Sequence, residues 1–287
     1  MVILDGKTTS AKIKAQIKTE IDEIVTKYKV DPPRLDIILV GDDFASIKYV
    51  QYKELACKEV GINPFVHRLE STCSLADILS LENILNSNNA VSGYYVQLPL
   101  PKCLNEFEVL ESINPQKDVD GLTSTNLGLL FKKNPIAICP ATALAIVGLL
   151  EEYQIELLGK KVLIIGASDI VGLPTGALMI QKGATVTFAN SKTVNTAELA
   201  YNSDIVVSAV GKAKLVRADW IKEGTVVVDV GFSQDSQTGK AVGDVDFEAV
   251  AEKTSYISKV VGGVGPMTIA YLLKNTLEVW KRTLKLK

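Results

Sequence analysis

The stretch VLIIGASDIVGLPTGALM, residues 162–179, joins a continuous apolar run to a helix-forming segment through a glycine turn. The apolar run is typical of a strand covered on both faces, as in parallel sheets. Gly166 and Gly172 bracket the turn with Ser168 between them, so the closely spaced glycines of the usual dinucleotide fingerprint are incomplete. Backbone N–H groups in such a turn favour the binding of an anion, and the pyrophosphate of a dinucleotide is the expected ligand. The spacing of the glycines alone is explained equally well by a strand-to-helix turn that binds no ligand as by a pyrophosphate-binding turn.

Strand-like and helix-like patterns alternate along almost the whole chain. Apolar residues at helical spacing predict helices at 7–29 and 45–61, each followed by a helix stop, and an apolar run predicts a strand at 35–41. After the glycine turn, three short valine-rich strands follow one another. We therefore expect an α/β fold of two domains. These are a parallel α/β domain at 1–138, completed by a C-terminal helix at 266–287, and a Rossmann-like, doubly wound domain at 139–265.

Composition and charge exclude several classes of protein. The 287 residues carry a net charge of about −2 with both signs mixed, so no basic surface for nucleic acid is expected. The four cysteines form no C-x-x-C pair, which argues against a disulfide framework or a zinc site and fits a reducing cytosol. Neither a signal peptide nor a membrane-spanning run is visible. We expect a cytoplasmic protein with no metal, nucleic-acid or membrane partner.

The predicted strand at 184–190 ends where NAD-binding folds often place an acidic residue that holds the ribose hydroxyls. Here the segment contains Asn190, Ser191 and Lys192 instead. Without a carboxylate at this place, a 2′-phosphate on the ribose would not be repelled. A serine hydroxyl and a lysine ammonium group can bind such a phosphate. The segment therefore favours NADP over NAD.

Two polar features precede the turn. Tyr49 and Lys53 stand one helical turn apart and so project from the same face, although a surface pair at this spacing is common. Gln97 ends a predicted strand immediately before a Pro-x-Pro turn, where open parallel sheets bind ligands, although it can also simply cap the strand.

Three further features have a plain structural explanation beside a functional one. Asp118 and Asp120 precede Gly121, in a pattern that surface turns also favour. The glycine-rich loop 262–265 leads into a helix through Pro266, as a linker or as a place where backbone approaches a ligand. His67, the only histidine, lies in a strand-like stretch and is expected to be structural, so a Ser-His-Asp triad has no candidate.

Taken in order, these stretches resemble the methylenetetrahydrofolate dehydrogenase/cyclohydrolase family, the bifunctional enzymes of one-carbon folate metabolism. The resemblance covers nearly the whole chain, and it is specific because of the ordered series rather than any single motif. The matching segments are YVQYK (49–53), VQLPLP (96–101), KDVDGL (117–122), GASDIVGLP (166–174), SAVGK (208–212) and GGVGPMTIAYLL (262–273).

The resemblance implies a folate site on the first domain. It makes Lys53 the principal catalytic residue, with Gln97 as its hydrogen-bonding partner, Asp120 as the anchor of the pterin ring and Tyr49 stacked on the ligand. These four form the implied catalytic set. Implied substrate-binding residues are Tyr49, Gln97, Leu98, Pro99, Asp120, Gly262, Gly263 and Pro266.

The resemblance also implies a cofactor site on the second domain. The family usually has an arginine at position 167 that helps to hold the 2′-phosphate of NADP, and this chain has Ala167. NADP is therefore expected, with NAD as an alternative. Other departures from the family pattern are at Ala143, Asn190, Ala213 and 259–261. The implied cofactor-binding residues are Gly166, Ala167, Ser168, Val171, Gly172, Asn190, Ser191, Lys192 and Gly211.

The activity implied by the resemblance has two steps: oxidation of 5,10-methylenetetrahydrofolate with NADP, and hydrolysis of the methenyl product to 10-formyltetrahydrofolate. The resemblance also implies a homodimer and a link to purine biosynthesis. Two alternatives stay open at this point. One is a cyclohydrolase with weak or NAD-linked dehydrogenase activity, and the other is a non-catalytic regulator that binds folate or a nucleotide.

Overall fold

The structure, a computed structural model, describes residues 1–234 and 239–286. The chain forms two compact units. One comprises Met1–Ala11 and Thr142–Thr268 and is called the six-stranded unit here, after its main sheet. The other comprises Lys12–Ala141 and Ile269–Lys287 and is called the three-stranded unit.

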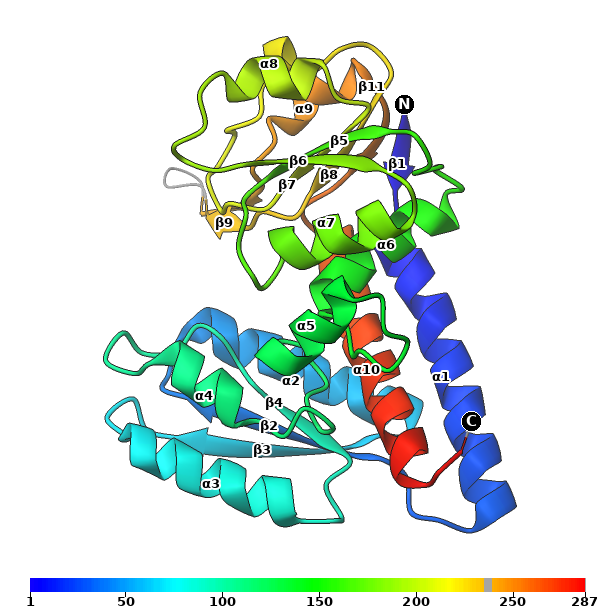
Figure 1. Ribbon diagram of the computed structural model, residues 1–287, viewed down its shortest axis with the longest axis vertical. Helices are drawn as coiled ribbons and strands as arrows, with labels where there is room; N and C mark the ends of the chain where they lie inside the picture. The colour runs from blue at the N-terminus through cyan, green and yellow to red at the C-terminus, as the bar shows by residue number, and fades with distance from the viewer. Residues whose placement is uncertain (235–238, 287) are drawn as a thin grey trace. The chain divides into compact units, whose positions relative to one another are not determined.

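The three-stranded unit is a parallel sheet covered on both faces, as the continuous apolar runs predict (Figure 1). Its order is β3-β2-β4, with β2 in the centre. Side chains of α1, α2 and α10 share one buried cluster with Leu35, Ile37 and Leu39 of β2, whereas α3 and α4 pack against Ile38 and Val40 on the opposite face. The elements are β2 (Arg34–Val40), β3 (Asn63–Leu69), β4 (Gly93–Val96), α1 (Gly6–Tyr28), α2 (Phe44–Val60), α3 (Leu75–Ser87), α4 (Glu106–Ser112), α5 (Ser124–Phe131) and α10 (Val264–Thr283).

Local signals fix the ends of α2, which positions the candidate catalytic lysine. The carboxylate of Asp43 accepts a hydrogen bond from the Ser46 amide at 2.8 Å and caps the first turn. At the other end, Gly61 adopts a left-handed conformation with φ 84°, so the predicted helix stop is confirmed. The predicted return of the C-terminal helix is also confirmed, because Leu277 and Trp280 of α10 lie in the same core as α2.

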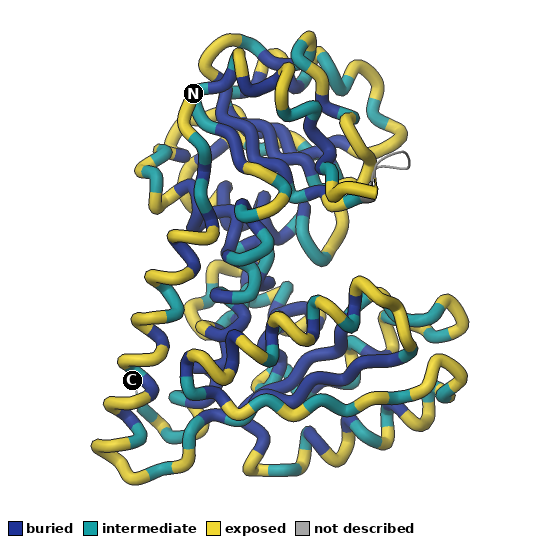
Figure 2. Tube along the Cα trace, turned by 180° about the vertical axis from the view of Figure 1, so that it is seen from behind, coloured by how far each residue is buried: buried dark blue, intermediate teal, exposed yellow. Residues whose placement is uncertain are grey.

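The six-stranded unit is a doubly wound parallel sheet in the order β1-β11-β8-β7-β5-β6. Helices α8 and α9 contribute to the buried cluster on one face, and α7 packs against β5 and β6 (Figure 1). The central strands are buried along almost their whole length (Figure 2). The elements are β1 (Val2–Leu4), α6 (Ala141–Glu152), β5 (Lys161–Ile165), α7 (Gly172–Gln181), β6 (Thr185–Ala189), α8 (Thr196–Tyr201), β7 (Ile205–Ser208), η1 (Ala218–Trp220), β8 (Thr225–Asp229), β9 (Ser233–Gln234), β10 (Ala241–Val242), α9 (Phe247–Ala251) and β11 (Thr254–Ser258).

The first eleven residues belong to the six-stranded unit, whereas the expected domain at 1–138 placed them in the other unit. Strand β1 pairs in parallel with β11, with Ile3 opposite Ile257, and so adds the outer strand to the six-stranded sheet. A three-residue strand is too short to show a period, so the sequence pattern did not predict it.

A buried glutamate joins α3 to α4 in the three-stranded unit. Glu82 is fully buried, its Oε2 accepts a hydrogen bond from the Ser112 hydroxyl, and its Oε1 has no partner among the described residues. Burial raises the pKa of Glu82 from 4.5 to about 7, while the hydrogen bond from Ser112 acts in the opposite direction. The folded state therefore favours the protonated acid more than the unfolded chain does.

Glu82→Gln is expected to stabilise the protein at alkaline pH. A raised folded-state pKa contributes stability that is complete below about pH 4.5 and is lost as the pH rises through about 7. Glutamine stays neutral, so at pH 8 the variant should gain on the order of 2–3 kcal/mol in the free energy of unfolding. Urea denaturation at pH 5 and pH 8 measures this, with exposed Glu23→Gln as the control. An equal pH dependence in wild type and Glu82→Gln would refute the expectation.

Candidate active site

Lys53 is the centre of the polar cluster in the three-stranded unit. It projects from α2 and is only 5% exposed, which is rare for a lysine. Its Nζ donates a hydrogen bond to Oε1 of Gln97 at 3.1 Å. Burial lowers the pKa of Lys53 to about 8, against the opposing effects of Asp120 and Cys57. An amine of this kind can accept and return a proton near neutral pH.

Two tyrosine rings flank the amine. The Nζ of Lys53 lies 5.0 Å from the ring centroid of Tyr49, one turn earlier on α2, and 4.1 Å from that of Tyr95 on β4. The structure thus brings Tyr49 and Lys53 together, in agreement with the predicted shared helix face. Tyr95 was not among the predicted residues, because it lies within an apolar strand pattern. The sequence feature that could have identified Tyr95 is the alternation of side chains along a strand, which places Tyr95 on the same face as Gln97.

Gln97 follows β4 directly and is held by its backbone and its side chain. Its amide N–H donates to the carbonyl of Ile38 on β2 at 2.8 Å, which fixes the residue at the carboxyl end of the sheet. Its Nε2 donates to the carbonyl of Leu98 at 2.6 Å, so its Oε1 is turned toward Lys53. Leu98 and Pro99 continue the same segment through a cis peptide bond.

The two aspartates of the segment 117–121 have different surroundings. Asp118 is fully buried and accepts hydrogen bonds from the amides of Gly121 and Thr123 and from the side chain of Asn126. It therefore shapes the loop. Asp120 interacts electrostatically with Lys53: burial raises the pKa of Asp120, while Lys53 opposes that shift. Of the two explanations left open for this segment, a plain surface turn is wrong for Asp118, because this side chain is buried.

The six-stranded unit presents three loops at one edge of its sheet. They follow β5, β6 and β7, which are neighbours in the order β7-β5-β6. Because the chain moves from β5 to β6 on one side and then to β7 on the other, the end of β5 is the switch point where doubly wound sheets bind ligands. The predicted cofactor residues lie in these loops or at the start of α7. They are Gly166, Ala167, Ser168, Val171 and Gly172 after β5, Asn190, Ser191 and Lys192 after β6, and Gly211 after β7.

Close backbone contacts explain the two glycines of the turn. Gly166 has φ 107°, and a Cβ there would lie 2.4 Å from the carbonyl oxygen of Ala209 in the loop after β7. A Cβ on Gly172 would lie 1.8 Å from the carbonyl oxygen of Gly166. The hydroxyl of Ser168 accepts a hydrogen bond from the Val171 amide at 3.2 Å. The turn is therefore a tight surface of backbone that suits a pyrophosphate.

The loop after β6 is closed by its own polar side chains. Asn190 donates its amide N–H to the hydroxyl of Thr193 at 2.9 Å, and its Oδ1 accepts from the Lys192 amide at 2.9 Å. The side chains of Ser191 and Lys192 are exposed. A serine hydroxyl and an ammonium group are donors that fit a phosphate, and no acid in the loop 190–193 would repel it.

The loop after β7 rests on a buried carboxylate that sequence reasoning missed. Asp244 is fully buried and accepts hydrogen bonds from the Ser208 hydroxyl and from the amides of Val210 and Lys212, at 2.7–2.9 Å. Gly211 lies between the two amide donors, with φ 66°. The sequence signal was the segment GDVDF (243–247), to which no role could be given without the fold.

The three remaining predicted substrate residues lie in the six-stranded unit. Gly262 has φ 94°, and its carbonyl accepts a hydrogen bond from the Lys7 amide at 3.0 Å. A Cβ on Gly263 would lie 2.2 Å from the carbonyl oxygen of Lys259. Pro266 stands in the first turn of α10, where its missing N–H does no harm. The segment is thus a tight turn and not a flexible linker.

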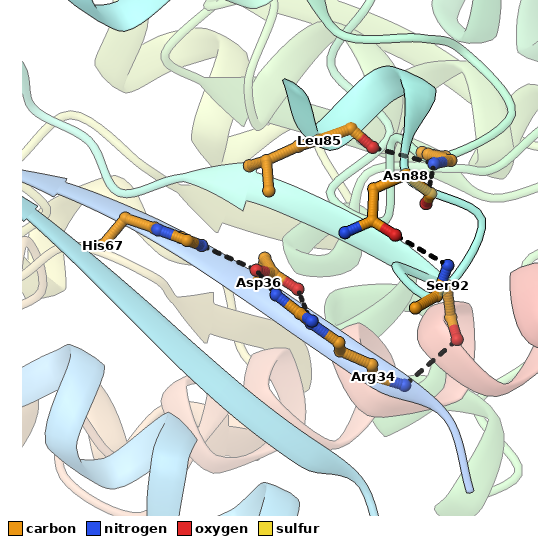
Figure 3. Close-up of polar contacts among 8 residues, drawn as sticks. Arg34, Asp36, His67, Leu85, Asn88 and Ser92 are labelled. Atoms are coloured by element: carbon orange, nitrogen blue, oxygen red, sulfur yellow. Dashed lines mark hydrogen bonds and ion pairs between the residues drawn. The ribbon is translucent and has the colours of Figure 1, made fainter. Parts of the chain in front are cut away.

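His67 takes part in an ion-pair cluster on β2 and β3 of the three-stranded unit (Figure 3). Its Nε2 lies 2.6 Å from Oδ1 of the fully buried Asp36, and Arg34 donates two hydrogen bonds to the same carboxylate. The negative charge of the buried Asp36 carboxylate is therefore balanced by Arg34. This agrees with the expected structural role of the histidine.

Among residues 1–234 and 239–286, no group of three or more His, Cys, Asp or Glu side chains could hold a metal ion. In the same residues, no helix is long and apolar enough to cross a membrane.

Known proteins resemble this chain over nearly its whole length. A protein named bifunctional protein FolD from Aliarcobacter butzleri is 47% identical over 281 residues, which cover 98% of this chain and 97% of the relative. The crystal structure of the FolD methylenetetrahydrofolate dehydrogenase/cyclohydrolase from Campylobacter jejuni has a TM-score of 0.95 at 43% identity, covering 98% of this chain and 99% of that one. The Trypanosoma brucei FolD structure with NADP and an inhibitor has a TM-score of 0.95 at 36% identity, covering 99% of both chains.

Two family patterns divide the chain between them. Residues 4–120 match the catalytic domain of tetrahydrofolate dehydrogenase/cyclohydrolase, and residues 140–284 match its NAD(P)-binding domain. The first match contains Lys53, Gln97 and Asp120, and the second contains the glycine turn. The chain therefore belongs to the tetrahydrofolate dehydrogenase/cyclohydrolase family.

Proposed function

We propose that this protein oxidises 5,10-methylenetetrahydrofolate to 5,10-methenyltetrahydrofolate with NADP and hydrolyses the product to 10-formyltetrahydrofolate. The observation that carries the proposal is the buried amine of Lys53, which donates a hydrogen bond to Gln97. Burial also lowers the pKa of Lys53 to about 8. A buried lysine of this kind is costly for stability, and titratable groups in such surroundings cluster at functional sites.

In the hydrolysis step, Lys53 manages protons. Water attacks the methenyl carbon, a proton must leave that water, and a ring nitrogen must be protonated as the ring opens. Lys53 can perform both transfers because its pKa of about 8 lies close to physiological pH. Gln97 fixes the direction of the amine, since its own Nε2 is held by the Leu98 carbonyl.

The other residues of the three-stranded unit bind the substrate in this proposal. Tyr49 stacks on the folate, and Asp120 anchors the pterin ring through its hydrogen-bonding edge. The raised pKa of Asp120 suits a carboxyl group that meets a heterocycle in a partly buried place. Leu98 and Pro99 are proposed to contact the substrate beside Gln97. Gly262, Gly263 and Pro266 also stay proposed substrate-binding residues.

In the oxidation step, the loops after β5, β6 and β7 hold NADP, which when bound supplies a hydride acceptor. Gly166 and Gly172 leave the backbone accessible to a pyrophosphate, and Ser191 and Lys192 supply donors for a 2′-phosphate. Gly211 lies in a loop that Asp244 holds in shape. The step needs no proton removal from the substrate, because the nitrogen lone pair drives the hydride away, so a catalytic histidine is not required.

Steady-state rates on methylenetetrahydrofolate with NADP and with NAD, together with turnover of methenyltetrahydrofolate, test the proposal. Turnover of both substrates, with NADP preferred, supports it. Hydrolysis with feeble or NAD-linked oxidation would support the second candidate, a mainly hydrolytic enzyme, which Ala167 at the proposed phosphate site favours. If methenyltetrahydrofolate is hydrolysed no faster than in the spontaneous reaction, the result would support the third candidate, a non-catalytic protein that binds folate or a nucleotide.

Ala167→Arg is expected to increase the preference for NADP over NAD. A guanidinium at this place in the turn can donate charge-assisted hydrogen bonds to a 2′-phosphate, worth about 1.5–3 kcal/mol. The ratio of kcat/KM for NADP to that for NAD should therefore rise about tenfold or more, mainly through a lower KM for NADP. Ala167→Met adds length without charge. An equal gain in that variant would contradict the electrostatic explanation.

We further propose that the protein is a cytoplasmic homodimer and that its product feeds purine biosynthesis. The homodimer and the link to purine biosynthesis rest on the family to which the chain belongs, and the cytoplasmic location rests on the four dispersed cysteines. Sedimentation equilibrium of the purified protein distinguishes a dimer of the 31.0 kDa chain from a monomer.

A further inference from the structure

Tyr95 holds the ring closest to the amine of Lys53. Its ring centroid lies 4.1 Å from Nζ, compared with 5.0 Å for Tyr49. Tyr95 is 1% exposed, whereas Tyr49 is half-buried. A cation over an aromatic face is attracted by the negative charge of that face, and the attraction is strongest where water is excluded. Of the two rings, Tyr95 is therefore the one expected to act on Lys53 more strongly.

The contact between Tyr95 and Lys53 is made by the ring and not by the hydroxyl. The hydroxyl of Tyr95 is buried and has no hydrogen-bond partner among the described residues. Such an unpaired group destabilises a folded protein, so packing alone would favour a residue without it. The neighbouring Tyr94 shows the usual arrangement, because its hydroxyl donates to Asn86 at 2.8 Å.

Opposing influences meet at Lys53. Burial disfavours the ammonium form, while a nearby carboxylate and an aromatic face favour it. Gln97 accepts one hydrogen bond from the amine and is neutral, so it orients Lys53 without supplying charge. The titratable groups around this site are Tyr49, Glu54 and Cys57 on α2, Tyr95 on β4, and Asp120 in the loop before α5.

We propose that Tyr95 is a positioning residue for the hydrolysis step, whose ring face holds the ammonium of Lys53 and sets the pH at which this group gives up its proton. The inference rests on the proposed function of Lys53 and adds a determinant of its ionisation besides burial and the charges of Asp120 and Cys57. It gives a reason for an aromatic side chain at a buried position where the hydroxyl has no partner among the described residues.

The experiment replaces Tyr95 by phenylalanine and then by 3,5-difluoro- and 3,4,5-trifluorophenylalanine at the same position. The shape of the ring is almost constant across the series, while fluorine progressively removes the negative charge of its face. The limb of the kcat–pH profile for methenyltetrahydrofolate hydrolysis that reports Lys53 should move to lower pH at each step. A total shift of roughly 0.5–1.5 pH units is expected. The direction is the same whether Lys53 acts as acid or as base.

Two results would overturn the inference. If the limb stays in place across the fluorinated series, the ring face does not act on Lys53. If Tyr95→Phe alone moves the limb as far as the trifluoro variant does, the hydroxyl matters and not the ring. Tyr94→Phe is the matched control, because it removes a hydroxyl from the same strand without touching the lysine, and it should leave the limb where it is.

A measurement without substrate separates this inference from the proposed function. Carbon-13 labelling of lysines allows Lys53 to be titrated by NMR in the wild type and in each Tyr95 variant, with the Lys53→Met spectrum assigning the signal. If hydrolysis is absent in the wild type, the proposed function fails, yet the NMR titration still reports whether the pKa of Lys53 falls with fluorination. A constant pKa overturns the inference even in an active enzyme.

Discussion

Lys53→Met is expected to abolish the hydrolysis of methenyltetrahydrofolate while the protein stays folded. Methionine replaces the aliphatic stem of the lysine at similar volume and removes only the amine that donates to Gln97. Loss of a positioned acid–base group lowers the rate by about 10²–10⁴-fold. Since hydride transfer needs no proton removal from the substrate, the dehydrogenase rate should fall much less. The measurement is kcat for each reaction, with the melting temperature as the check on folding.

Lys58→Met is the matched control for this variant. Lys58 lies on the same helix and is exposed, so its replacement removes the same charge from α2 without touching the site. Its hydrolytic rate should equal that of the wild type. Hydrolysis by Lys53→Met within about threefold of the wild-type rate would remove Lys53 from the mechanism, and a loss in both variants would point to the net charge of the helix instead.

Elements such as α1, α2, β2 and β5 were predictable because each carries its own periodic or apolar pattern. The run that became β5 is apolar from Val162 to Ile165, and the run that became β2 is interrupted only by Asp36 between Leu35 and Val40; a sheet covered on both faces favours such runs. Strand β1 was not predictable, because its pairing with β11 joins residues more than 250 positions apart, and no local pattern records such a contact. The same limit explains why residues 1–11 were expected with the other unit.

For the site, the sequence could supply residue types but not their surroundings. Tyr49 and Lys53 were predictable as a pair because helical geometry places them on one face. Whether that face is buried depends on β4, which brings Tyr95 and Gln97 to the amine. Asp118 shows the reverse case, since its acidic side chain resembled a site residue or a surface turn and proved to be a buried loop anchor.

Gly172→Ala is expected to remove most of the dehydrogenase activity and to leave the hydrolase activity in place. A Cβ at this position would lie 1.8 Å from the carbonyl oxygen of Gly166 and 3.2 Å from the Cα of Ala167, so the backbone of the turn must move. Backbone cannot yield as the end of a flexible side chain can. The turn is also packed from its other side, because Gly166 abuts the carbonyl of Ala209. The displaced amides would then no longer meet the pyrophosphate together.

The expected result is a rise in the KM for NADP, with kcat/KM for oxidation reduced by at least about 100-fold. The hydrolysis of methenyltetrahydrofolate serves as an internal measure of folding, because its proposed catalytic residues lie in the other unit. Gly128→Ala is a suitable control: a Cβ there meets nothing within 4 Å, so both activities should stay unchanged. If Gly172→Ala binds NADP as the wild type does, the turn after β5 is not the nucleotide site. If both activities fall together with the melting temperature, the contact between Gly166 and Gly172 is needed for folding, and its role in binding would have to be tested at Ser168 instead.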